Sequence, residues 1–166
     1  MGAVSFHSWR GCDDVTLKKW ADAAKAINVP LLVGEGSTDA AAHGYAEIFN
    51  ESTFALYEIN LYTRICAICQ PLSILQWQLT SDYSLLWGDG IYGSKGPLRP
   101  TQRFWNIKQL ASTPADALAI PVSSSKKNVN CAAFGNMVRG EYAVHMVNNG
   151  ADCEAVISGI PAEVKE

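Results

Sequence analysis

The segment Pro30-Leu-Leu-Val-Gly-Glu35 constrains the fold more than any other, because it is apolar along its length and ends in a glutamate. A strand-length run that is apolar on both faces is typical of a parallel sheet covered on both sides. Strand-like runs also occur at residues 4–9 and 72–79, and helix-length amphipathic segments separate them. This alternation predicts an α/β fold with a parallel sheet and right-handed crossover connections.

Helices are expected between and after these strands. The first begins at a cap provided by Asp13 or Asp14 and ends before Pro30. The second is the apolar segment 54–69. Pro100 is expected to open the last one, at a first-turn position where the missing N–H of proline costs little.

The pattern changes near residue 114. Short strand-like runs at 117–122, 129–134, 142–147 and 155–157 are separated by polar and glycine-containing turns. They indicate an antiparallel β-sandwich that is partial, since such sandwiches usually have about seven to nine strands. We therefore expect two domains, residues 1–113 and residues 114–166, and a chain truncated at both ends.

Composition excludes several classes of function. The chain is 48% hydrophobic and 17% charged, which is typical of a globular protein, and its net charge is −3. Its lysine pairs are isolated, so no nucleic-acid partner is expected. No apolar stretch reaches the length of about 18 residues that a membrane span needs, and the N-terminus does not resemble a signal peptide.

The cysteines do not indicate a metal or redox site. There are five of them, an odd number, and they are sparse for a disulfide scaffold. Cys66 and Cys69 form a C-x-x-C within an apolar helical run, without a second such pair or a nearby histidine. Buried structural thiols are therefore expected, and no metal or cofactor is implied.

Glu35 is the main candidate for chemistry. In α/β barrels, catalytic groups lie at the C-terminal ends of strands, and Glu35 ends the apolar strand. A carboxylate beside a low-dielectric core needs hydrogen bonds or a charged partner. Gly34 and Gly36 flank it and are expected to leave room for a ligand. The alternative is a glutamate at a loop edge that caps the next helix.

The neighbouring strand ends supply further candidates. Trp9 and Trp77 would border a cleft around Glu35, where aromatic rings stack on the apolar faces of sugars, or they pack in the core instead. His7 either orients Glu35 or bonds a sugar hydroxyl, and the alternative to both is a satisfied core histidine. Asp82 either bonds substrate hydroxyls or caps a turn. Glu58 and His145 are expected to be structural.

These residues resemble a known family. Leu31-Leu-Val-Gly-Glu35-Gly-Ser-Thr-Asp39 resembles the seventh-strand nucleophile segment of clan A glycoside hydrolases, such as the glucosylceramidase-like and xylanase-like families. Residues 5–9 are similar to the sixth strand, and residues 74–79, with Trp77, are similar to the eighth. Residues 100–110 resemble the last barrel helix, which in several of these families leads into a β-sandwich.

The resemblance implies the C-terminal part of a (β/α)8 TIM barrel followed by a partial β-sandwich. A complete barrel takes about 250 residues, so the remainder of the barrel is expected upstream. Glu35 would be the nucleophile of a retaining glycosidase, and Trp77 would lie under the sugar at the cleavage point. An extracellular or periplasmic location, and an oligosaccharide or polysaccharide substrate, follow from the resemblance alone.

One element of the family pattern is missing. A retaining glycosidase needs two carboxyl groups about 5–5.5 Å apart, one as nucleophile and one as acid/base. In this clan the acid/base is a glutamate, usually after an asparagine, at the end of the fourth strand. The only Asn-Glu dipeptide here, Asn50-Glu51, lies in a connection before a helix. The leading hypothesis is therefore a fragment that carries the nucleophile and lacks the acid/base.

Two other functions remain open at this point. The first is a non-catalytic carbohydrate-binding or structural fragment, which the missing acid/base favours. The second is a different barrel enzyme with Glu35 as a general base. It ranks lower, because the strand ends offer no lysine or metal ligands.

Overall fold

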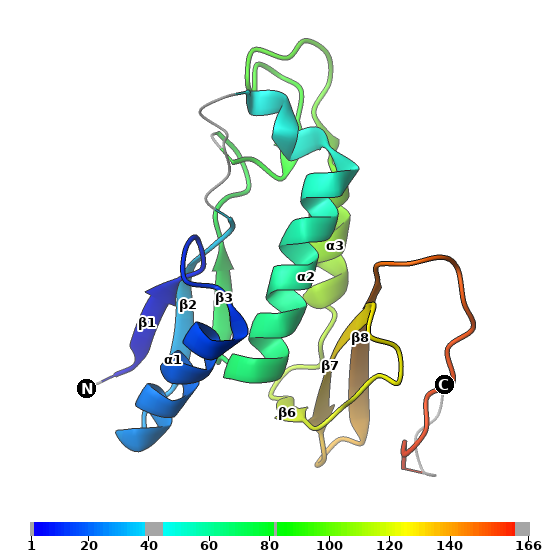
Figure 1. The fold of residues 1–166 in the computed structure, drawn as a ribbon. Helices are drawn as coiled ribbons and strands as arrows, with labels where there is room; N and C mark the ends of the chain where they lie inside the picture. The colour runs from blue at the N-terminus through cyan, green and yellow to red at the C-terminus, as the bar shows by residue number, and fades with distance from the viewer. Residues whose placement is uncertain (1, 39–44, 82, 162–166) are drawn as a thin grey trace.

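The computed structural model describes residues 2–38, 45–81 and 83–161 (Figure 1). Its elements, in chain order, are β1 (Val4–His7), α1 (Asp14–Ala26), β2 (Leu31–Gly36), η2 (Ala46–Asn50, a 3₁₀ helix), α2 (Ser52–Cys69), β3 (Ser73–Gln76), β4 (Leu86–Trp87), β5 (Arg99–Pro100), α3 (Gln102–Leu110), β6 (Leu118–Ile120), β7 (Val129–Asn136) and β8 (Glu141–Asn148). The predicted mixture of strands and helices is confirmed.

The predicted parallel sheet is present. It has three strands in the order β1-β2-β3, and both pairings are parallel. Its core is built from β1, β2, α1 and α2, with Val33, Leu17 and Ile65 fully buried together. Leu31 and Val33 are thus apolar because they pack against the helices, whereas Leu32, on the opposite face of the strand, is half-buried.

The helix starts follow the capping chemistry of individual residues. Of the two candidates for the first helix, Asp13 is the cap, and its carboxylate accepts a hydrogen bond from Thr16 N at 3.0 Å. The bonds from the Thr16 side chain and backbone lower the pKa of Asp13. The expectation that Pro100 opens α3 is wrong. Thr101 is the cap, because its hydroxyl accepts from Phe104 N at 3.5 Å, and Pro100 pairs with Leu86 in a short ribbon.

The part of the chain after residue 114 differs from the expected sandwich. It forms one antiparallel sheet in the order β6-β7-β8. Residues 155–157, expected as a fourth strand, have no strand structure. Within the described residues no second sheet faces this one, and α2 contacts β7 and β8 instead (Figure 1). The division into domains 1–113 and 114–166 stays a prediction.

Three amides, which we call the asparagine cluster (Asn60, Asn130 and Asn149), connect α2 to this sheet. Asn60 on α2 donates from Nδ2 to Asn149 Oδ1 at 2.6 Å. Its own Oδ1 accepts from Asn149 Nδ2 at 2.9 Å and from Asn130 Nδ2 at 2.6 Å. Helix α2 is therefore joined to the parallel sheet by apolar packing and to the antiparallel sheet by amides.

The two cysteines of the C-x-x-C are buried, as the sequence predicts. Cys66 and Cys69 are buried on α2, and burial raises the pKa of the Cys66 thiol to about 12 and that of Cys69 to about 11. Thiols with such pKa values are poor metal ligands and nucleophiles, as expected of structural residues. Among the described residues, no helix is long and apolar enough to cross a membrane.

Candidate active site

The ends of β1 and β2 bring His7 and Glu35 together. The two residues are register partners in the parallel pairing, and Ser8 N donates to Glu35 O at 3.1 Å just beyond them. His7 Nδ1 lies 3.4 Å from Glu35 Oε2. The Glu35 side chain is 15% exposed and that of His7 is 53% exposed. The carboxylate is thus mostly enclosed but accessible, with an imidazole as its neighbour.

The two predicted tryptophans lie at the same edge of the sheet. The Trp9 ring meets the His7 ring edge-on, with their centroids 5.0 Å apart. Trp77 directly follows β3. Its backbone N–H donates to the carbonyl oxygen of Gly36 at 2.7 Å, and Gly36 is the residue after Glu35. The two tryptophans are 41% and 43% exposed, so neither is a core residue. Exposed indole faces of this kind are the surfaces on which sugar rings stack.

The remaining predicted residue, Asp82, lies outside the described residues. The Trp77–Gln78 peptide bond before it is cis. Beyond it, Tyr83 O accepts from Gln78 N at 3.3 Å and Gln78 O accepts from Leu85 N at 3.0 Å. Gln78, two residues past the end of β3, is thus bonded to the backbone of both Tyr83 and Leu85.

The glycines beside Glu35 were expected to leave room for a ligand, and the structure has protein side chains in the space beside both of them. A Cβ at Gly36 would lie 2.7 Å from Ile74 Cγ2 and 2.8 Å from the Tyr62 hydroxyl. A Cβ at Gly34 would lie 2.4 Å from Ser5 Oγ. Both glycines therefore make room for side chains of the protein itself, and in the case of Gly36 for the residues that support the strand end.

Buried polar residues of α2 contact the strand ends. The sequence did not predict these contacts. Tyr62 on α2 donates its hydroxyl proton to Gln76 Oε1 at the end of β3. Burial, with the nearby Glu58 charge, raises the pKa of Tyr62 well above its usual value, so the phenol keeps its proton. The signal in the sequence was Glu58 itself, the one acidic residue of a mostly apolar helix.

Glu58 was expected to be structural, and its contacts agree. It forms a bidentate ion pair with Arg103 on α3, with Nε–Oε1 and Nη2–Oε2 distances of 3.0 and 2.8 Å. Both side chains are fully buried. Glu58 is therefore committed to Arg103 and is not available as a second catalytic carboxylate.

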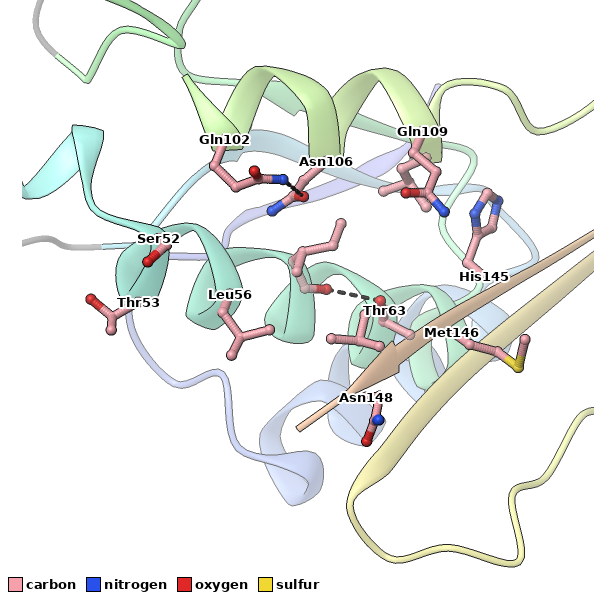
Figure 2. A pocket seen from close by; sticks show the side chains of 13 residues that line it. Ser52, Thr53, Leu56, Thr63, Gln102, Asn106, Gln109, His145, Met146 and Asn148 are labelled. Atoms are coloured by element: carbon pink, nitrogen blue, oxygen red, sulfur yellow. Dashed lines mark hydrogen bonds between the residues drawn. The ribbon is translucent and has the colours of Figure 1, made fainter. Parts of the chain in front are cut away.

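His145, also expected to be structural, lies on β8 and away from the strand ends. Its Nε2 is 2.7 Å from Thr113 Oγ1, and burial lowers its pKa. It lines a cavity of about 450 Å³ between α2, α3 and β8, which Leu56, Gln102 and Asn106 also line (Figure 2). A second cavity of about 490 Å³ runs along β3 and α3.

Among the described residues, the carboxylate that the strand ends bring to the site is that of Glu35. Glu35 can act as a nucleophile or as a base, since it is enclosed and has an imidazole beside it. Among the residues that the structure describes, no three histidine, cysteine or acidic side chains are grouped as metal ligands would be. The described part of the site is thus a carboxylate with an imidazole beside it and two exposed tryptophans at the same edge of the sheet.

Solved structures with a similar fold are known. No protein-family model matches the sequence, and no curated protein matches it. A solved GH30 endoxylanase from Clostridium papyrosolvens C71 is similar, with a TM-score of 0.66 and 12% identity over 90% of this chain and 34% of that one. A GH39 beta-xylosidase from Caulobacter crescentus gives 0.48 and 14% over 81% of this chain and 32% of that one.

The chain therefore spans about a third of the length of the solved structures that it matches. At such low identity the likeness to the endoxylanase concerns the fold alone. That fold, with its parallel strands and helices, is consistent with part of a barrel.

Proposed function

We propose that this chain is the nucleophile-bearing part of a retaining glycoside hydrolase that cleaves β-linked glycans. The observation that carries the proposal is the pairing of Glu35 with His7 at adjacent strand ends, beside two exposed tryptophans. The resemblance of residues 31–39 to a clan A nucleophile segment supports it, as does the fold shared with an endoxylanase. Xylan-type oligosaccharides are therefore the first substrates to test.

In this proposal Glu35 attacks the anomeric carbon and forms a covalent glycosyl-enzyme intermediate. His7 orients the carboxylate through Nδ1, and Trp9 and Trp77 bind the sugar faces. Asp82 accepts hydrogen bonds from sugar hydroxyls. The acid/base, which must lie about 5–5.5 Å from the nucleophile, comes from the remainder of the barrel upstream. No cofactor takes part, and the protein acts outside the cell or in the periplasm.

The test is Glu35→Gln in the full-length protein, assayed with aryl β-xylosides and xylo-oligosaccharides. We expect kcat to fall by more than about 1,000-fold, as for other lost nucleophiles. Glu154→Gln is the matched control, because Glu154 is an exposed glutamate far along the chain from the strand ends. Turnover near the unmutated level in Glu35→Gln would remove Glu35 from the mechanism.

A second variant identifies the role of Glu35 directly. In Glu35→Ala, azide can attack the anomeric carbon in place of the carboxylate and displace the aryloxide. Because this is a single displacement, the product from a β-glycoside is the α-glycosyl azide. Saturable binding of oligosaccharide by the unmutated protein without any turnover would instead favour the carbohydrate-binding alternative.

A further inference from the structure

A buried polar network lies between α2, α3 and all three strand ends. Its centre is the Glu58–Arg103 ion pair, whose two side chains have no appreciable exposure. Arg103 also donates from Nη1 to Tyr83 O at 3.0 Å and to Ser84 O at 2.9 Å. A buried ion pair adds little net stability compared with apolar packing. Stability alone therefore does not explain why these two charges are buried here.

On one side the network reaches β1 and β2. Ser37 Oγ donates to Glu58 Oε2 at 3.2 Å, and Ser37 is two residues past Glu35. Ser37 N donates to Ser8 Oγ at 3.1 Å, and Ser8 Oγ donates back to Ser37 O at 2.5 Å. Ser8 lies between His7 and Trp9. The Ser8 side chain therefore joins the ends of β1 and β2 just beyond the last backbone hydrogen bond between the two strands.

On the other side the network reaches the end of β3. Tyr83 O, which accepts from Arg103, also accepts from Gln78 N at 3.3 Å. Gln78 follows Trp77 directly. The guanidinium thus fixes the backbone that carries Trp77, through one intervening carbonyl.

We infer that the Glu58–Arg103 pair, acting through Ser37 and the Tyr83 carbonyl, positions the strand ends that carry Glu35, Trp9 and Trp77. The inference rests on the proposed function, since it assigns the network a task at that site. Neither Glu58 nor Arg103 reaches the substrate; both are positioning residues. Positioning of this kind matters because a misplacement of about 1 Å at the reacting atoms can cost about 100-fold in rate.

Ser37→Ala tests the connection while leaving the ion pair intact. In the full-length protein we expect kcat for aryl β-xylosides to fall by about 10-fold or more. KM should change by less than about 2-fold, because the loss falls on the transition state. The matched control is Thr63→Val, since Thr63 is also buried on α2 and its hydroxyl donates to Ile59 O within the helix, with no bond to the network among the described residues.

Amide hydrogen exchange gives a readout that does not depend on turnover. Ser37→Ala should speed exchange of the Ser8, Ser37 and Trp77 amides, while Thr63→Val should not. Unchanged exchange, an unchanged kcat, or an equal kcat loss in Thr63→Val would each overturn the positioning role. Glu35→Gln is assayed in parallel. If it is inactive while Ser37→Ala is fully active, the positioning role fails and the proposed function stands; if Glu35→Gln stays active, the proposed function fails and the positioning role with it.

Discussion

The Glu58–Arg103 pair gives a prediction whose magnitude can be worked from the structure. Glu58→Gln keeps the shape of the side chain but leaves the Arg103 charge uncompensated in a site closed to solvent. Removing one partner of a buried pair costs about 3–5 kcal/mol. Arg103 keeps two carbonyl acceptors, and its guanidinium lies 4.9 and 5.3 Å from the Phe49 and Phe54 rings. We therefore expect the lower end, a loss of about 3 kcal/mol.

Arg103→Met should cost more than Glu58→Gln. It leaves the Glu58 carboxylate buried without its partner and removes the donor to Ser84 O, so we expect the upper end of about 3–5 kcal/mol. In the double variant no charge remains, and the main cost is the unsatisfied Ser84 carbonyl, about 1–3 kcal/mol. The two single losses sum to about 8 kcal/mol, so the double variant should be more stable than that sum implies, by about 5–7 kcal/mol.

Urea unfolding followed by tryptophan fluorescence measures these losses, with the slope m checked for constancy. Single losses that add to the double loss within about 0.5 kcal/mol, as they do for independent sites, would contradict the coupling between Glu58 and Arg103. A loss in Glu58→Gln below the value of about 1 kcal/mol expected of an exposed pair would contradict it as well.

Three smaller predictions concern other parts of the fold. Gly36→Ala should lower the free energy of unfolding by about 1–3 kcal/mol, because the new Cβ meets Ile74 Cγ2 at 2.7 Å; urea unfolding measures it. Cys66 and Cys69 should not react with a thiol reagent at pH 8 in the native protein, because burial raises their pKa values to about 12 and about 11. Burial lowers the pKa of His145 below its unfolded value of 6.5, so neutral His145 is favoured in the fold. Stability should therefore fall as the pH drops below about 6.5, since the unfolded state then binds more protons.

Each of these has a matched control. Gly2→Ala should be neutral, because nothing lies within 4 Å of a Cβ there. The exposed Cys153 should react under the conditions that spare the buried thiols, and rapid modification of all thiols would contradict their burial. His145→Gln should lose less stability than the unmutated protein between pH 7 and pH 5; an equal loss would assign the acid sensitivity to other groups.

Much of the site could be predicted because it depends on local pattern and strand polarity. The apolar run before Glu35 fixed a buried parallel strand, and parallel strands present their C-terminal ends at one edge of a sheet. His7 and Glu35 were therefore expected as neighbours, and the structure places them 3.4 Å apart. The Asp13 cap could be anticipated in the same way, because its partner Thr16 is only three residues away.

The rest depends on partners that are distant in the sequence. Glu58 and Arg103 are 45 residues apart, and nothing local in either helix indicates the other. Gly36 is a glycine because of Tyr62 and Ile74, which only the fold brings beneath it. Residues 155–157 have strand composition but no strand beside them, and β-propensity is expressed only where a partner strand and packing exist.

Asn149 is the member of the asparagine cluster at which stored protein will age first, because Gly150 follows it and offers no side chain to hinder ring closure. Deamidation would replace the Nδ2 donor by a carboxylate oxygen. That oxygen would face Asn60 Oδ1 and Asn128 O, which now accept from Nδ2 at 2.9 and 3.2 Å. In stored protein the contact between α2 and the β7–β8 hairpin would therefore weaken, while the strand ends stay intact. Loss of the protein on storage would begin at a position far from Glu35.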